Sequence, residues 1–330
     1  MLITWPHRHS DWQDVLQDVE PVYAQIAAHI TRRERLLINC WDEAHIAQVT
    51  ARLQAAGVAM HNVICHAIHS NDTWTRDYGP LTVLQDGRPE LLDFIFNGWG
   101  GKFDAELDNQ VTRHLHRRGL FGRATLDSMD MVLEGGSIEV DGRGSLLTTE
   151  NCLLAPTRNP GLERAQIEER LRSCLGVTNI LWLSHGHLIG DDTDSHIDTL
   201  ARFCDPHTIA YVACDDPDDE QYAGLQQMEA ELRACRDLEG QAYKLVPLPW
   251  PTAKYDETDG RRLAASYANF LIINGAVLVP SYDDPADAET LRRLQPCFPG
   301  REVIGVPCMP LIRQNGSLHC ITMQLPAGVL

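Results

Sequence analysis

Cys320 lies in a short run with strand propensity near the end of a chain of 330 residues. A thiolate is a strong nucleophile, and an attack on the electron-poor carbon of a nitrogen-rich cation would give a covalent intermediate. The chain has ten cysteines without CxxC pairs or a regular spacing, which predicts reduced thiols that mostly fill core space. Cys320 therefore needs chemical partners elsewhere in the sequence before it can be given a catalytic role.

Asp77 and Trp74 lie in the polar stretch NDTWTRDYGP, which ends in a Gly-Pro turn signal. A carboxylate there could pair with a guanidinium through charge-assisted hydrogen bonds. Trp99, in the Gly-rich stretch NGWGG, could form with Trp74 an aromatic wall that holds a cation. The plainer alternatives are an Asx-turn closed by a salt bridge of Arg76 and a tryptophan packed on the core.

Glu134 stands where an apolar run meets two glycines, which fits either a carboxylate placed for chemistry or a capped turn. His196 and Asp198 are two positions apart in a strand-like run, so alternation would put both side chains on one face. Such a pair is a candidate acid–base unit, although a hydrogen-bonded core histidine would give the same pattern. By the same alternation, His319 is expected to point away from Cys320.

Histidines and aspartates are dense between residues 185 and 198, which raises the question of a metal centre. The chain contains neither HExxH nor a Cys-rich zinc spacing, and we predict no bound metal. No GxGxxG motif or P-loop follows a predicted strand. The sequence therefore gives no indication of a nucleotide cofactor.

The formal net charge is −18, and affinity for phosphate backbones requires accumulated Lys and Arg. Nucleic acid is therefore not an expected partner, whereas an acidic protein can steer a small cation towards a cleft. No segment has the ~18 consecutive apolar residues that span a bilayer. The N-terminus lacks the pattern of a secretory signal. We expect no membrane interaction and a cytoplasmic location.

Strand-like runs alternate with amphipathic helical patterns along the whole chain. Strands are predicted at residues 36–40, 63–68, 91–97, 131–140, 145–154, 180–183, 197–203, 208–213, 243–248, 270–280, 302–306 and 318–323. Helices are predicted at residues 12–30, 46–53, 107–115, 167–175, 222–238 and 286–294. The first helix is expected to start at a capping box formed by Ser10 and Gln13.

The alternation amounts to about five strand-strand-helix-strand modules, without a Ser/Gly/Pro-rich linker between them. Such a series predicts a ring of repeated units and one domain spanning residues 1–330. The alternative α/β arrangement is a plain doubly wound sheet.

Six stretches occur in one order along nearly the whole chain: NDTWTRDYGP, FNGWGG, EGGSIEVDG, DDTDSHIDTLARF, DGRRLAASYANFLIINGAVLVP and GSLHCITMQLP. Together they resemble the agmatine deiminase family of the guanidino-group-modifying, or pentein, superfamily. The resemblance implies a five-bladed, pseudo-fivefold α/β propeller with the active site in its central channel. This fold agrees with the modules seen in the hydropathy pattern.

The resemblance also implies roles for single residues. Cys320 matches the family nucleophile and His196 the general acid and base, while Asp77 and Asp198 match the carboxylates that grip the guanidinium. Glu134 matches the acid that orients the histidine and substrate. Three further residues fall where the family contacts its substrate, namely Trp74, Trp99 and Asp192.

The reaction implied by this resemblance is hydrolysis of agmatine to N-carbamoylputrescine and ammonia through an amidino-cysteine intermediate, with no cofactor. It also suggests a homo-oligomer. Two alternatives stay open: deimination of arginine or peptidyl arginine, and non-catalytic binding of a cationic metabolite. Free arginine would require a cationic partner for its α-carboxylate, for which Arg76 and Arg313 are the candidates.

The chain departs from the family pattern at two places. Many members carry GGGN before the cysteine motif and GHIDN around the histidine, whereas this chain has QNGS at 314–317 and SHIDT at 195–199. All the chemical groups are retained. We therefore expect the same reaction class with a different loop shape around the substrate tail.

Overall fold

The computed structural model describes residues 1–330 as two compact units. The first unit comprises Met1–Gly135, Leu271–Ala276 and His319–Leu330, and the second comprises Gly136–Phe270 and Val277–Leu318. The single domain expected from the sequence remains a prediction.

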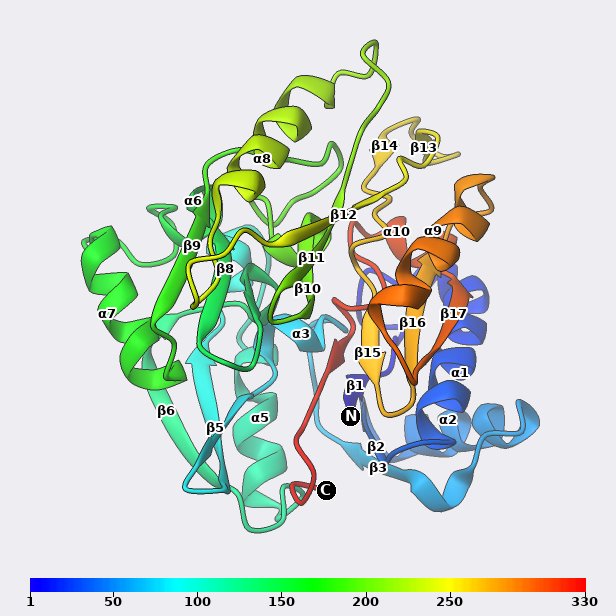
Figure 1. Cartoon of the computed structure of the whole chain (residues 1–330). Helices are drawn as coiled ribbons and strands as arrows, with labels where there is room; N and C mark the ends of the chain where they lie inside the picture. Colours follow the sequence, from blue (N-terminus) through cyan, green and yellow to red (C-terminus); the bar gives the residue numbers. More distant parts are fainter. The chain divides into compact units, whose positions relative to one another are not determined.

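The first unit holds a sheet in which the last strand of the chain pairs with the first. The strands are β1 (Leu2–Thr4), β2 (Leu36–Cys40), β3 (Val63–Ala67) and β18 (Thr322–Met323), in the order β18-β1-β2-β3 (Figure 1). β1 runs parallel to β2 and antiparallel to β18, with Leu2 opposite Met323. The segment that follows Cys320 is therefore held by sheet hydrogen bonds.

Two helices pack beside this sheet, α1 (Leu16–Thr31) and α2 (Glu43–Ala55). The Asp42 carboxylate caps α2 by accepting a hydrogen bond from the backbone N–H of His45 at 2.7 Å. The predicted capping box at the start of α1 is wrong, because the hydroxyl of Ser10 donates to the carbonyl of His7 at 2.7 Å. The α-helix begins only at Leu16, after a 3-10 turn.

A second sheet in the first unit has the order β4-β5-β6, formed by β4 (Leu81–Gln85), β5 (Arg88–Ile95) and β6 (Thr125–Val132). β4 and β5 are antiparallel, and β5 and β6 are parallel. Helix α5 (Asp108–Arg117) connects the parallel strands and packs against β5 (Figure 1). Two short helical turns, α3 (Thr75–Tyr78) and α4 (Gly98–Gly101), lie in the connections before β4 and after β5.

The second unit repeats this arrangement twice. One sheet contains β7 (Ile138–Val140), β8 (Ser145–Thr149) and β9 (Asn179–Leu183), and another contains β10 (Ala201–Asp205), β11 (Thr208–Val212) and β12 (Lys244–Leu248). In each, the first two strands are antiparallel and the third is parallel to the second. The helices that join the parallel strands are α7 (Arg164–Leu175) and α8 (Tyr222–Ala234).

Local sequence accounts for the boundaries of the β7–β9 module. The turn between β7 and β8 forms because the carboxylate of Asp141 accepts from the backbone N–H groups of Arg143, Gly144 and Ser145. Helix α7 ends at Gly176, whose φ of 69° suits glycine at a helix C-terminus. The end of α7 agrees with the predicted helix at 167–175, whereas the strands predicted at 131–140 and 145–154 are too long, because a 3-10 turn at Gly135–Ser137 separates β6 from β7 and β8 ends at Thr149.

The remaining elements are α6 (Glu150–Leu153), β13 (Lys254–Tyr255), β14 (Arg262–Leu263), β15 (Leu271–Ile273), β16 (Ala276–Ser281), α9 (Ala286–Leu294), β17 (Glu302–Pro307) and α10 (Met309–Ile312). All strands belong to small sheets of two to four strands. The predicted mixed α/β class is confirmed, and the alternative of one large doubly wound sheet is not observed.

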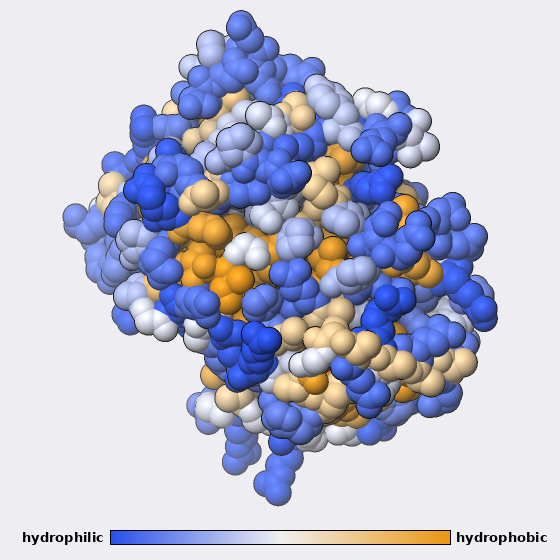
Figure 2. Space-filling model, turned by 90° about the vertical axis from the view of Figure 1, so that its right-hand side faces the viewer, coloured by the Kyte–Doolittle hydropathy of each residue, from blue (hydrophilic) through white to orange (hydrophobic).

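Hydrophilic residues cover most of the face shown in Figure 2. This distribution agrees with the formal net charge of −18. None of the helices combines the length and the apolar character that crossing a membrane requires.

Candidate active site

Trp99 and Asp77 are joined by a hydrogen bond in the first unit. The indole N–H of Trp99 donates to Oδ2 of Asp77 at 2.9 Å, and both residues are buried. Trp99 has a φ of 54°, and Gly98 and Gly100 beside it also have positive φ values. A side chain on Gly98 would place its Cβ 2.1 Å from the carbonyl oxygen of Phe103. The glycines thus allow the sharp turn that directs the indole at Asp77.

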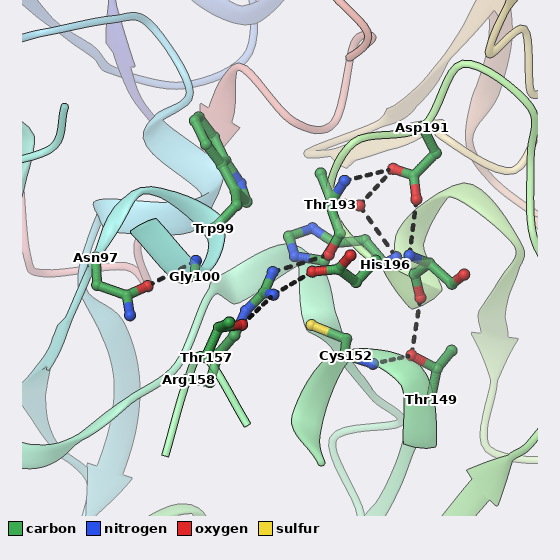
Figure 3. Close-up of polar contacts among 12 residues, drawn as sticks. Asn97, Trp99, Gly100, Thr149, Cys152, Thr157, Arg158, Asp191, Thr193 and His196 are labelled. Atoms are coloured by element: carbon green, nitrogen blue, oxygen red, sulfur yellow. Dashed lines mark hydrogen bonds and ion pairs between the residues drawn. The ribbon is translucent and has the colours of Figure 1, made fainter. Parts of the chain in front are cut away.

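The side chain of Asn97 stabilises the same turn. Its Oδ1 accepts from the backbone N–H of Gly100 at 2.9 Å (Figure 3). Trp99 holds a left-handed backbone conformation, which is unfavourable for a bulky side chain and is often found at functional sites.

Arg76 fastens the loop of Asp77 to the segment that contains Cys320. The backbone N–H of Arg76 donates to the carbonyl of Cys320 at 3.1 Å. Its guanidinium donates from Nε to the carbonyl of His319 at 3.4 Å and from Nη2 to Oε1 of Gln324, and Nη1 lies 3.6 Å from Sδ of Met323. One buried residue therefore contacts both sides of Cys320.

Glu134 lies near the segment of Arg76 because the backbone of the next residue, Gly135, packs closely against the backbone of Arg76. Glu134 is completely buried. At the next residue, Gly135, an added Cβ would lie 2.2 Å from the carbonyl oxygen of Arg76. Glycine is required there because any side chain would collide with this backbone.

Cys320 itself lies in a turn and not in a strand. β18 covers only Thr322–Met323, and the N–H and hydroxyl of Thr322 both donate to the carbonyl of His319, at 3.1 and 3.0 Å. The predicted strand at 318–323 is therefore too long. Because residues 319 and 320 are not in a strand, alternation does not determine the direction of the His319 side chain. Cys320 is 7% exposed and therefore buried.

His196 and Asp198 lie in the second unit and are almost completely buried. They do not belong to a strand as predicted, because a 3-10 helix occupies Ile197–Thr199. The hydroxyl of Thr199 donates back to the carbonyl of His196 at 2.9 Å, and Nδ2 of Asn269 donates to the carbonyl of Asp198 at 3.3 Å. Local side-chain hydrogen bonds hold this segment in place of a β-ladder.

Asp191 organises the loop that precedes His196. Its Oδ1 accepts from the N–H of Thr193 at 3.1 Å, and its Oδ2 accepts from the N–H of Ser195 at 2.7 Å. The hydroxyl of Thr193 then accepts from the N–H of His196 at 3.2 Å, as Figure 3 shows. Thr149 closes the other side by donating its hydroxyl to the carbonyl of Ser195 at 2.8 Å.

Arg158 stabilises the same loop through contacts to Asp194 and to the backbone of Thr193. The buried guanidinium forms an ion pair with Asp194, and its Nη2 donates to the carbonyl of Thr193 at 3.0 Å (Figure 3). Asp194 and Ser195 have positive φ values of 67° and 69°. The ion pair and the Asp191 carboxylate together compensate for this unfavourable backbone.

Asp192 contacts the loop that departs from the family pattern. Nδ2 of Asn315 donates to Oδ2 of Asp192 at 2.8 Å. Arg261 in turn donates from Nη1 to Oδ1 of Asn315 at 2.5 Å. The QNGS sequence at 314–317 thus supplies an amide that orients Asp192.

Comparison with known proteins identifies the family of the chain. The family model for Porphyromonas-type peptidyl-arginine deiminases matches residues 1–326. The agmatine deiminase of Pseudomonas aeruginosa (strain LESB58) is 38% identical over 98% of this chain and 92% of the relative. The chain belongs to this deiminase family.

Two solved structures extend the comparison. A Porphyromonas gingivalis protein provisionally described as an arginine deiminase is 51% identical, covers 99% of this chain and 95% of its own, and has a TM-score of 0.92. A C. jejuni agmatine deiminase with a cysteine changed to serine and substrate bound is 38% identical, covers 97% and 90%, and has a TM-score of 0.88. The deiminase fold therefore extends over almost the whole chain.

The predicted site residues of this deiminase divide between its two units. The first unit contains Trp74, Asp77, Trp99, Glu134 and Cys320, and the second contains Asp192, His196 and Asp198. In the first unit, hydrogen bonds and close backbone contacts connect the segments of Asp77, Trp99, Glu134 and Cys320. The catalytic and binding roles given to these residues remain predictions.

Several residues that position the others are not indicated by the sequence. The sequence predicts for Arg76 only a salt bridge or a contact to a substrate carboxylate, and it predicts no positioning role for Asp191, Thr193 or Arg158. A signal existed for Asp191 and Thr193, since an Asp two residues before a Thr is typical of side-chain-capped turns. Nothing in the sequence around Arg158 indicates that it pairs with Asp194.

Proposed function

We propose that this chain is an agmatine deiminase, which converts the guanidinium of agmatine into a ureido group and releases ammonia. The observation that carries this proposal is the set of contacts between Arg76 and residues on both sides of Cys320. These contacts hold the nucleophile beside Asp77, which is the next residue after Arg76. Full-length similarity to agmatine deiminases at 38% identity supports it further.

Binding would rest on carboxylates and indoles. Asp77 and Asp198 accept hydrogen bonds from the guanidinium N–H groups, which fixes a planar cation in one orientation. The faces of Trp74 and Trp99 attract its positive charge. The Trp99–Asp77 hydrogen bond of 2.9 Å couples one indole to one carboxylate, so the two are positioned together.

The first chemical step is attack by the Cys320 thiolate on the central guanidinium carbon. The new S–C bond gives a tetrahedral adduct, and His196 transfers a proton to one nitrogen, which leaves as ammonia. An amidino-thioether on Cys320 remains. Rigid positioning matters because delocalised charge makes the guanidinium carbon a poor electrophile.

The second step consumes one water molecule. His196 accepts a proton as water attacks the amidino carbon, and the S–C bond of the resulting adduct breaks to release the thiolate and N-carbamoylputrescine. Glu134 orients His196 and the substrate. The balance is agmatine and water giving N-carbamoylputrescine and ammonia, with no cofactor consumed.

The choice of agmatine over arginine follows from the contacts of Arg76 and Arg313, the two residues that could bind the α-carboxylate of free arginine. The guanidinium of Arg76 already contacts His319, Met323 and Gln324. Nε of Arg313 lies 3.7 Å from Oδ2 of Asp256. A substrate without an α-carboxylate therefore suits this chain better.

We further propose that the repeated sheets are the blades of one five-bladed α/β propeller within a single catalytic domain. The shared strand order of the β4–β6, β7–β9 and β10–β12 sheets supports this arrangement. A cytoplasmic location and a homo-oligomeric state also remain predictions.

The test is release of ammonia and of a ureido product from agmatine, arginine and a peptide containing arginine. We expect release from agmatine that exceeds release from the other two by at least about tenfold in kcat/KM, equivalent to about 1.4 kcal/mol. Cys320→Ala should abolish it without changing the melting temperature. Faster release from arginine would reassign the substrate, and binding of agmatine without any ammonia would indicate a non-catalytic binder.

A further inference from the structure

Asp72 accepts hydrogen bonds from two indoles. Its Oδ1 accepts from the indole N–H of Trp12 at 2.7 Å and from the backbone N–H of Thr73 at 2.7 Å, and its Oδ2 accepts from the indole N–H of Trp74 at 3.2 Å. The rings of Trp12 and Trp74 also pack against each other, with centroids 5.6 Å apart. The indole N–H of Trp12 also donates to the hydroxyl of Thr73 at 3.0 Å, so Asp72 is one of two acceptors for Trp12 and is the acceptor for Trp74.

The electrostatic surroundings of Asp72 disfavour its negative charge. All of its donors are neutral, and its acidic neighbours are Asp11 and Asp108. Burial and the repulsion by Asp11 raise the pKa of Asp72 to about 6, in spite of the three hydrogen bonds. The other titratable groups near it are the hydroxyls of Tyr23 and Tyr78, whose pKa values burial raises, so both are neutral, and that of Tyr78 donates to the backbone carbonyl of Asp72 at 3.0 Å.

An amide would be less costly at this position than a carboxylate. Asparagine has almost the same shape and no charge, so it would avoid burying an anion among apolar rings. It has only one acceptor oxygen, however, and its NH₂ group would face one of the two indole N–H groups. Because Oδ1 already accepts from Trp12 and Thr73, the second carboxylate oxygen is what allows Asp72 to accept from Trp74 as well. When the carboxylate accepts the hydrogen bond from the indole N–H of Trp74, the indole ring becomes more electron-rich. This strengthens its attraction to a cation on its face.

We propose that Asp72 is a positioning residue for substrate binding, which fixes the Trp74 indole as a cation-binding wall at a cost to the stability of the fold. The inference rests on the proposed function, since it takes Trp74 to contact the guanidinium. Asp72 acts only through Trp74. It does not touch the reacting atoms.

The experiment measures agmatine binding by calorimetry in a Cys320→Ala background, which removes turnover. Asp72→Asn in this background should weaken binding about tenfold at pH 7.5, because the Trp74 indole loses its acceptor. The same substitution should leave the melting temperature unchanged or raise it, because the buried charge is gone. Asp86→Asn, at an exposed turn residue, is the matched control and should change neither quantity.

A double-mutant cycle with Trp74→Phe tests whether Asp72 affects agmatine binding through the Trp74 indole. Phenylalanine keeps an aromatic ring and lacks the N–H, so Asp72→Asn should weaken binding less than about twofold in the Trp74→Phe background. An equal loss in both backgrounds would overturn the inference.

The outcomes separate this inference from the proposed function. Failure of the Cys320→Ala protein to bind agmatine overturns both. Binding by that protein that Asp72→Asn leaves unchanged overturns only the role of Asp72. A lower melting temperature with unchanged affinity would assign Asp72 a purely structural role, and it too overturns the inference.

Discussion

Two aspartates in the first unit accept hydrogen bonds from indole N–H groups, and they differ in the number of indoles that they contact. Asp77 accepts one from Trp99 at 2.9 Å, whereas Asp72 accepts one from Trp74 and one from Trp12. In both pairs the carboxylate and the ring orient each other. At the scale of single residues, the candidate site therefore depends on hydrogen bonds donated by tryptophan side chains. From the sequence alone, such side chains are expected to pack in the core.

Trp99→Phe should raise the KM for agmatine about tenfold and lower kcat, because Asp77 loses the donor that orients it and a charge-assisted hydrogen bond contributes about 1.5–3 kcal/mol. Steady-state kinetics measures both constants. Trp182→Phe is a matched control, since that indole also donates to a carboxylate, Glu168, at 3.0 Å. Equal effects of the two substitutions would contradict a specific role for Trp99.

Arg76→Lys should lower kcat by roughly 10–100-fold with little change in KM. Lysine keeps the charge but cannot reproduce the planar donor fork that contacts His319 and Gln324, and small displacements of a nucleophile are costly. The measurement is kcat together with the melting temperature, and Arg164→Lys on the surface of α7 serves as the control. A kcat equal to that of wild type would show that Cys320 does not depend on this contact.

At the scale of elements, the helices were predictable and the active-site turns were not. The 3.6-residue spacing of apolar side chains correctly indicated α2, α5 and α7. The sequence predicts strands around both His196 and Cys320, since apolar residues flank them. Their real conformations depend on partners distant in sequence, such as Arg76 for Cys320 and Thr149 for Ser195.

The strands β1 and β4 were also missed. β1 has only three residues, too few to show alternation, and its pairing with β18 joins Leu2 to Met323. Sequence patterns carry information about local periodicity, whereas pairing over such a separation is decided by tertiary packing. The residue set of the candidate site came from the resemblance to a family and not from the predicted elements.

Gly135→Ala should destabilise the fold by about 2–3 kcal/mol, because its Cβ would overlap the carbonyl of Arg76 at 2.2 Å and the backbone must move apart. The shift would also displace Glu134, so activity should fall. Thermal or urea unfolding measures the change. Gly224→Ala in α8 is the control: nothing lies within 4 Å of its Cβ position, and the better helix propensity of alanine should stabilise the chain by up to about 1 kcal/mol. Equal stability changes for the two variants would contradict the close-approach argument.

At the scale of the whole molecule, a net charge of −18 destabilises the folded state through repulsion between like charges. The buried negative charge of Asp72 adds to this destabilisation. The folded-state pKa of Asp72, about 6, lies above its ordinary value of 3.8. The folded chain therefore binds this proton more tightly than the unfolded chain does. The resulting stabilisation is complete below pH 3.8 and is lost as the pH rises through about 6.

Asp72→Asn should therefore gain stability relative to wild type as the pH rises. The difference in unfolding free energy between the variant and wild type should increase by about 1–3 kcal/mol between pH 4 and pH 7.5. Urea unfolding at several pH values measures it, and Asp86→Asn should give a flat difference. A difference that decreases with pH would mean that Asp72 is stabilised as an anion.

The pairing of β1 with β18 also affects how the protein is made. β1 is synthesised long before its antiparallel neighbour β18, because Leu2 pairs with Met323. Until then one edge of the first sheet stays open, and Arg76 lacks the backbone groups around Cys320 that it will contact. The sheet and the contacts of Arg76 can therefore be completed only after the segment from His319 to Gln324 has been synthesised.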